Sequence, residues 1–185
     1  AQSLALEGHP VLQFDYRGTG DSFGQMENST LADFSEDVVD AIHFFQNKTG
    51  DQRFSLLGLR LGANIALNLK YDATTTLKPE KIVGIDVIPD LSQYMNVCLR
   101  YNLATQLSVY NKVIRDRKKL IADMNQGISI NMFGYQVGKP LYDSIVGTET
   151  LSIDKSIRTR TTLIQITNNL KKGLPKLILD MGATG

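Results

Sequence analysis

The sequence predicts an α/β fold, a mostly parallel sheet flanked by helices, with a helical cap inserted into it. Three short apolar runs are typical of buried strands, at 11–15, 54–57 and 81–88. Two stretches between them repeat apolar residues at helical spacing. Strands that alternate with helices favour parallel pairing, because each helix returns the chain to the same end of the sheet.

The rhythm of strand and helix changes after Pro89, which ends the third apolar run. Most of the following residues have helical spacing, so we expect a cap rather than another strand–helix unit. The predicted organisation is a core part at 1–90, a cap at 91–150 and a return to the core at 151–185. The chain starts without methionine in a helix-like segment and stops abruptly, so we expect a fragment of a single, incomplete domain.

The first elements follow from local signals. Residues 1–7 have helical character, and Gly8 is a plausible stop. Pro10 and a glycine-rich turn at 17–22 bound the first apolar run. The next helix begins at Thr30, in a pattern that resembles a capping box. Its apolar stripe comprises Leu31, Phe34, Val38, Ala41, Ile42 and Phe45.

The later elements are predicted in the same way. The second apolar run leads into a helix from Gly62 to about Tyr71, and the third strand follows at 81–88. Residues 92–124 are expected to be largely helical, and a glycine-containing stretch follows them at 127–138. Strand character returns at the end of the chain, at 161–167 and 176–179.

Composition excludes several classes of protein. The chain has 185 residues, of which 42% are hydrophobic and 21% charged, as in an ordinary globular protein with a core. Its net charge of +1 gives no sign of a nucleic-acid or anionic-membrane partner. Every apolar run falls short of the roughly 18 residues that a membrane span needs. We therefore expect a small-molecule ligand or substrate as partner, and the sequence leaves an oligomer open.

Cysteine and histidine are scarce. The lone Cys98 excludes an intrachain disulfide, fits a cytoplasmic location and lies in an apolar helical pattern where burial is expected. Two histidines and one cysteine lack the spacing of a metal site. The glycines at 58 and 62 match neither a dinucleotide fingerprint nor a P-loop. We predict no metal and no cofactor.

The segment Gly58-Leu59-Arg60-Leu61-Gly62 has the spacing of the G-x-S-x-G elbow, with a strand before it and a helix after it. Arginine stands where serine would attack, and its guanidinium stays protonated and has no usable lone pair. His9 and His43 both precede the elbow, whereas the triad order needs a later histidine. Acyl-enzyme chemistry by the usual serine triad is therefore excluded for this chain.

Two interpretations of Arg60 remain open. In the first, the side chain of this arginine pairs with a nearby carboxylate, and the sequence does not say which one. Separately, Asp86 and Asp90, near the end of the third strand, are the possible acids of a triad, but an aspartate without serine or histidine makes no triad. In the second, Gly58, Arg60, Leu61 and Gly62 form an anion site, because a helix N-terminus favours negative charge. A later predicted strand runs into Asn168-Asn169, an amide pair at the place where a triad carboxylate is expected.

Two segments, 11–22 and 56–63, resemble the α/β-hydrolase superfamily in its serine-aminopeptidase-like branch. More narrowly, the sequence is similar to the exosortase A system-associated hydrolases, which tend to carry arginine in a G-L-R-x-G-A elbow. The resemblance covers roughly residues 1–150. It implies that 11–15 and 54–57 are the fourth and fifth strands, and that the N–H of Leu61 is one oxyanion donor.

The basic run at 115–119 is expected to be a solvated helix face. A lipid or nucleic-acid patch would need further aromatic or basic residues beside the run, and none is recognised there. The hypothesis for function is a hydrolase-like protein without a standard triad that binds a small acyl-bearing or anionic ligand, with the cap shaping its pocket. One alternative is an active esterase or peptidase with an atypical nucleophile or with residues outside this chain. The other is a non-catalytic structural partner.

Overall fold

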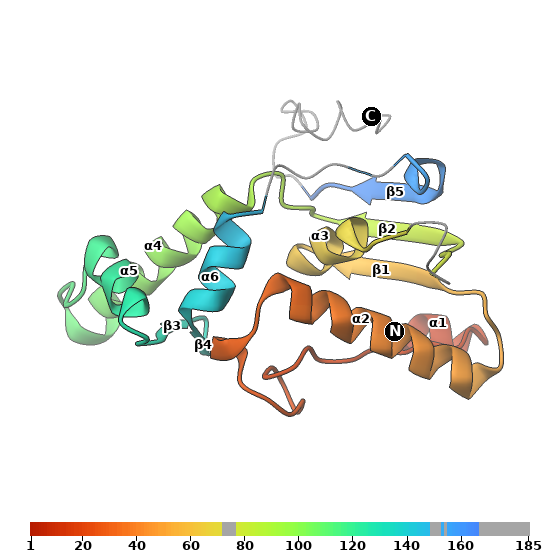
Figure 1. The fold of residues 1–185 in the computed structure, drawn as a ribbon, viewed down its shortest axis with the longest axis horizontal. Helices are drawn as coiled ribbons and strands as arrows, with labels where there is room; N and C mark the ends of the chain where they lie inside the picture. Colours follow the sequence, from red (N-terminus) through yellow and green to blue (C-terminus); the bar gives the residue numbers. More distant parts are fainter. Residues whose placement is uncertain (72–76, 149–152, 154, 167–185) are drawn as a thin grey trace. The chain divides into compact units, whose positions relative to one another are not determined.

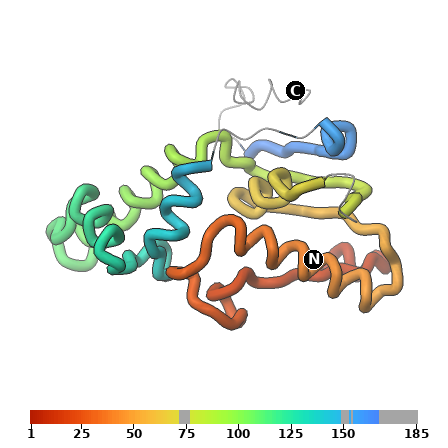
Figure 2. Tube along the Cα trace, in the orientation of Figure 1, coloured from red at the N-terminus to blue at the C-terminus, as the bar shows by residue number. Residues whose placement is uncertain are grey.

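The computed structural model describes residues 1–71, 77–148, 153 and 155–166 (Figures 1 and 2). The chain divides into two compact units. The sheet unit comprises Ala1–Phe14, Val38–Pro89 and Thr150–Gly185. The second unit comprises Asp15–Asp37 and Asp90–Glu149, and we name it the cap unit only because it contains most of the residues of the predicted cap. The cap unit thus includes a segment that precedes the elbow in sequence, in addition to the helical block.

The sheet unit contains three parallel strands, which confirms the predicted α/β class. They are β1 (Ser55–Leu59), β2 (Lys81–Ile85) and β5 (Thr161–Ile164), in the order β1-β2-β5. The helix α3 (Leu61–Asn68) follows β1 and packs on β1 and β2 (Figure 1). A short 3-10 turn, η2 (Arg158–Arg160), leads into β5.

Small residues let α3 lie close to the sheet. A Cβ atom added to Gly58 in β1 would lie 2.5 Å from the Cα atom of Ala63 in α3, so only glycine fits there. The core around this contact consists of fully or nearly fully buried apolar side chains, among them Ile42, Phe54, Ala63, Leu67 and Ile82. Close packing at Gly58 therefore fixes the start of α3 directly after β1.

The prediction of a buried strand at 11–15 is wrong. The segment follows helix α1 (Gln2–Leu6), but among the described residues no strand pairs with it. Val11, Leu12 and Phe14 are 37–40% exposed. A strand is buried in a sheet only when neighbouring strands take its hydrogen bonds, and no strand among the described residues pairs with this run.

Two of the other strands are shorter than predicted, whereas β1 extends two residues beyond the predicted end at 57. β2 ends at Ile85 rather than at 88, because Asp86 adopts a positive φ of 50°. β5 covers the first part of the predicted run at 161–167. The expected strand at 176–179 and the amide pair Asn168-Asn169 lie outside the described residues.

Helix α2 (Leu31–Thr49) confirms the capped helix predicted from Thr30. The Asp33 carboxylate accepts hydrogen bonds from the N–H and the hydroxyl of Thr30, and the Thr30 hydroxyl accepts one from the Asp33 N–H at 3.2 Å. In the cap unit, Arg17 forms ion pairs with Asp33 at 3.1 Å and with Asp37 at 2.7 Å. These contacts fasten the preceding glycine-rich loop to the first turns of the helix.

The predicted helical block at 92–124 forms two helices of the cap unit, α4 (Leu91–Tyr110) and α5 (Arg117–Asn125). Asn111 separates them in a left-handed conformation. The glycine-containing stretch forms a hairpin of β3 (Ile130–Met132) and β4 (Tyr135–Val137), followed by α6 (Lys139–Val146). A short 3-10 turn, η1 (Met26–Asn28), contacts β4 and α6.

The core of the cap unit is apolar. Its most buried side chains include Leu99, Leu120, Met124, Ile130 and Leu141. Cys98 is buried as expected.

Candidate functional site

Arg60 lies in a sharp turn between β1 and α3. Its backbone has a φ of 53° and a ψ of −119°. A positive φ is strained for a residue with a side chain, so the surrounding contacts must hold it. The Arg60 N–H donates to the carbonyl of Ile85 in the neighbouring strand at 2.8 Å, and its own carbonyl accepts from Ala63 at 3.0 Å and Asn64 at 3.2 Å. The chain therefore has the strand–turn–helix elbow that the glycine spacing predicts.

Three side chains meet at the carboxyl ends of the parallel strands. Arg60 follows β1, Asp86 follows β2 and Gln165 follows β5. Because parallel strands end at the same edge, residues distant in sequence become neighbours there. The Asp86 carboxylate accepts from the Arg60 guanidinium at 2.9 Å and from the Gln165 amide at 2.6 Å. The ion pair that the first interpretation of Arg60 expects is therefore present.

The Arg60–Asp86 pair is accessible to solvent. The arginine side chain is 52% exposed and the aspartate side chain is 21% exposed. Ion pairs this open to water contribute only about 0–1 kcal/mol, because water and salt screen the attraction. A competing anion can therefore replace Asp86 as the partner of the guanidinium at a small cost in free energy.

Gln165 is a site residue that sequence reasoning missed. Its Oε1 atom is buried and has no hydrogen-bond partner among the described residues. A buried carbonyl oxygen without a donor is costly, so its presence needs a reason. The only sequence signal was its place in the run at 161–167, since a residue that follows a parallel strand lies at the ligand-binding edge of such a sheet.

The N-terminus of α3 offers two backbone donors beside Arg60. In the described part of the chain, neither Leu61 nor Gly62 has a hydrogen-bond acceptor for its N–H. The first N–H groups of a helix have no partner within the helix and carry a partial positive charge. The predicted elbow set of Gly58, Arg60, Leu61 and Gly62 therefore combines a cation with two unused donors.

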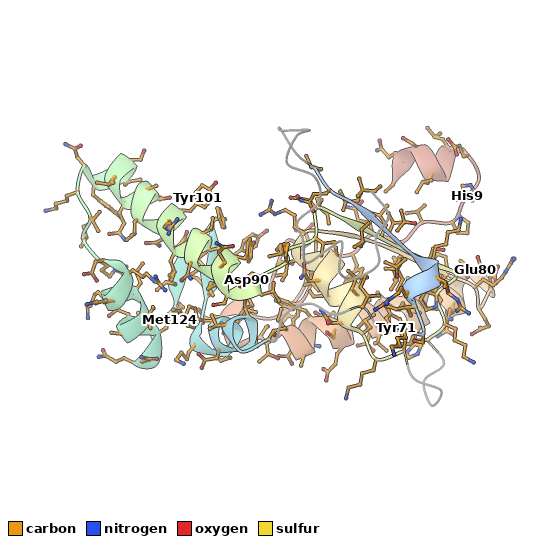
Figure 3. The ribbon with its side chains drawn as sticks, turned by 90° about the horizontal axis from the view of Figure 1, so that it is seen from above. His9, Tyr71, Glu80, Asp90, Tyr101 and Met124 are labelled. Atoms are coloured by element: carbon orange, nitrogen blue, oxygen red, sulfur yellow. The ribbon has the colours of Figure 1, made fainter. Side chains whose placement is uncertain are left out.

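The second predicted acid has a different position. Asp90 belongs to the cap unit, where its carboxylate accepts from the N–H of Gln93 at 2.8 Å and caps α4 (Figure 3). His43 is exposed, and so is His9, which lies in the loop after α1 (Figure 3). Of the predicted titratable candidates, the structure shows only Asp86 in contact with Arg60.

The side chains that meet at the elbow can bind a ligand but include no nucleophile. The guanidinium and the two N–H groups donate, while Asp86 and Gln165 accept. Within the ranges that the structure describes, no three histidine, cysteine or acidic side chains form a group that could hold a metal ion. None of the described helices combines the length and the apolar character that crossing a bilayer requires.

Comparison with known proteins gives partial support for the fold. No family model matches the chain. A stretch of 69 residues, 36% of the chain, is 36% identical to the lysophosphatidylserine lipase ABHD12 of Xenopus tropicalis, an α/β-hydrolase. The matched stretch spans 16% of the length of that lipase. The match supports the α/β-hydrolase superfamily and does not test the narrower resemblance to the exosortase-associated group.

Proposed function

We propose that this chain binds a small molecule with a carboxylate or phosphate group at the elbow, and that it does not hydrolyse substrates through a serine triad. The observation that carries the proposal is Arg60, a permanent cation held at a positive φ where an attacking oxygen would stand. The arginine-bearing elbow also supports the resemblance to the exosortase A system-associated hydrolases.

The donors around Arg60 suit an anionic oxygen. A cation at a helix N-terminus is unfavourable by about 0.3–1 kcal/mol, because the helix dipole places positive charge there. A bound anion reverses this effect, since it attracts both the guanidinium and the N–H groups of Leu61 and Gly62. The ligand would compete with Asp86 for the guanidinium, and the exposure of that pair favours the exchange.

Gln165 adds a possible contact for the rest of the ligand. Its Nε2 group is committed to Asp86, whereas its Oε1 atom lacks a donor among the described residues. A ligand with an N–H or O–H group next to its anion would satisfy that oxygen. Amino acids, hydroxy acids and phosphate monoesters have this arrangement.

The test is an NMR titration of the chain with inorganic phosphate and with acetate. We expect saturable shifts of the Leu61 and Gly62 amides, and a roughly 10–100-fold weaker response in Arg60→Gln, because a hydrogen bond to a charged group contributes about 1.5–3 kcal/mol. Arg53→Gln is the matched control, since Arg53 is also an exposed arginine in a 2.8 Å pair with an aspartate. Equal responses in both variants, or no saturation in the unmodified chain, would refute the proposal.

A second candidate function is an active lipid or ester hydrolase whose nucleophile is not residue 60. The similarity to a lysophosphatidylserine lipase favours it. A fluorophosphonate probe separates the two candidates, because it labels an activated serine covalently and leaves a binding protein unmodified. Labelling of the chain that survives Arg60→Gln would establish the hydrolase and exclude the proposal above.

A further inference from the structure

The turn between α4 and α5, residues 107–119, exposes an unusual number of apolar side chains. Five large apolar residues within eight positions are between 43% and 65% exposed: Leu107, Val109, Tyr110, Val113 and Ile114. Leu107 and Tyr110 lie three residues apart on a helix and are therefore neighbours on its surface. Single exposed apolar side chains are ordinary, but a concentration of this kind indicates a contact surface.

The same turn concentrates positive charge. It contains five basic residues and one acidic residue, a net charge of +4, whereas the rest of the chain contains 15 basic and 18 acidic residues. Two of the basic side chains, Arg115 and Lys119, form ion pairs with Asp123. The other three, Lys112, Arg117 and Lys118, have no carboxylate in ion-pair distance among the described residues.

Hydrogen bonds hold this turn in one conformation. The buried Gln106 accepts from the N–H groups of Ile114 and Arg115, both at 2.8 Å, and donates to the Arg115 carbonyl at 2.9 Å. The Asp116 carboxylate caps α5 by accepting from the N–H of Lys119 at 2.8 Å. These hydrogen bonds hold the backbone at the junction of α4 and α5 (Figure 1), and the exposed apolar side chains belong to this segment.

We infer that the α4–α5 turn docks on the surface of an anionic lipid bilayer. Apolar and aromatic side chains such as Tyr110, Val113 and Ile114 enter the interface between headgroups and acyl chains, while Lys112, Arg117 and Lys118 attract the lipid phosphates. The sequence predicted a solvated face for the basic run because aromatic or further basic residues were not recognised beside it. The structure shows that Tyr110, Val113 and Ile114, which precede the run, are exposed to solvent.

Charge decides between a bilayer and a protein as the occupant. An apolar patch alone suits either partner, but a surface of +4 on a chain of +1 favours a surface with many negative charges. The docking is peripheral and involves no membrane span. It rests on no part of the function proposed for the elbow, because every residue involved belongs to the cap unit.

The experiment is co-sedimentation of the chain with vesicles of phosphatidylcholine alone and of phosphatidylcholine with phosphatidylserine at roughly 7:3. One variant, Lys112→Gln/Arg117→Gln/Lys118→Gln, removes charge and keeps the apolar side chains. The other, Val113→Ser/Ile114→Ser, removes apolar surface and keeps the charge. The matched controls are Lys78→Gln/Lys81→Gln/Lys155→Gln, which also removes three exposed cations, and Phe23→Ser, which removes a fully exposed apolar side chain.

We expect binding to the anionic vesicles only. Each cation near such a surface contributes about a fivefold factor in partitioning, so the charge variant should bind about 100-fold more weakly. Loss of the two apolar side chains should weaken binding by at least about tenfold. Raising the ionic strength from about 0.1 M to about 1 M should release the chain, because the screening length falls from about 10 Å to about 3 Å.

Three results would overturn the inference. One is no binding to anionic vesicles, and another is equal loss in the control variants. The third is concentration-dependent self-association that Val113→Ser/Ile114→Ser abolishes while vesicle binding is absent, which would assign the turn to a protein partner. Thermal unfolding of each variant checks that the fold is intact.

Discussion

Asn64 is the residue through which α3 is fastened to the segment that carries Asp86. Its side chain is buried, with 1% of the residue exposed. The Asn64 amide donates to the Ile88 carbonyl at 2.7 Å, and its oxygen accepts from the Ile88 N–H at 3.0 Å. One side chain thus satisfies both backbone groups of a buried residue two positions after Asp86.

Replacing this side chain with an apolar one of similar size, Asn64→Leu, leaves the Ile88 N–H and carbonyl unpaired. Each buried group without a partner costs about 1–3 kcal/mol, so the free energy of unfolding should fall by about 2–5 kcal/mol. Asn68→Leu, at an exposed position of the same helix, removes only the hydrogen bond that the Asn68 amide donates to the Asn64 carbonyl at 2.8 Å and leaves no buried group unpaired, so it should cost about 1 kcal/mol or less. Asn64 also lies in α3, whose first N–H groups are the proposed donors to phosphate. Loosening the contact between α3 and Ile88 should therefore weaken phosphate binding at the elbow as well.

Urea unfolding followed by circular dichroism measures the stability of both variants, and amide hydrogen exchange at Ile88 measures the local effect. We expect faster exchange at Ile88 in Asn64→Leu and ordinary exchange in Asn68→Leu. The reasoning fails if Asn64→Leu costs less than about 1 kcal/mol or leaves exchange at Ile88 unchanged, since the two hydrogen bonds would then not secure this segment.

Three further predictions concern other parts of the chain. Gly58→Ala should destabilise the fold by about 3 kcal/mol or more, because the added methyl meets the backbone of α3; a loss below about 1 kcal/mol in urea unfolding would contradict this. The side-chain hydrogen bond from Lys119 holds the pKa of Asp123 below its ordinary value, so this carboxylate stabilises the fold above the unfolded pKa of about 4 and ceases to do so as the pH falls through the lowered value. Asp123→Asn should therefore flatten the loss of stability in acid unfolding curves; an unchanged slope would argue against it. Gln106→Ala should loosen the α4–α5 turn and weaken vesicle binding without altering an exposed side chain, whereas Ser108→Ala should do neither, as limited proteolysis and co-sedimentation would show.

The elbow could be predicted from sequence because its determinants are local. Gly58 is required by the close approach of α3, and the apolar run before it fits a buried strand whatever the neighbours are. The spacing of the two glycines around Arg60 predicted the sharp turn, and the positive φ of Arg60 is how the backbone makes that turn. Pairing of Arg60 with a carboxylate was one of two open interpretations, and the identity of that carboxylate, Asp86, depends on which residue follows the adjacent strand.

Other features depend on tertiary neighbours that a single sequence does not specify. The run at 11–15 has the same pattern with or without a partner strand, so burial could not be inferred from it. Gln165 became a site residue only through the order of the strands. By contrast, the break at Asn111 and the hairpin turn at Phe133 and Gly134 had local signals, an asparagine before a new helix cap and a glycine between two apolar runs.

The side chains joined at Asp86 are far apart in the chain, with 26 positions between Arg60 and Asp86 and 79 between Asp86 and Gln165. Contacts of such long range form late in folding, because closing large loops costs entropy before any attraction rewards it. During refolding, phosphate affinity should therefore arise after helical circular dichroism has recovered. A refolding intermediate that lacks β5 would keep the bend at Arg60 but leave Asp86 without its amide partner.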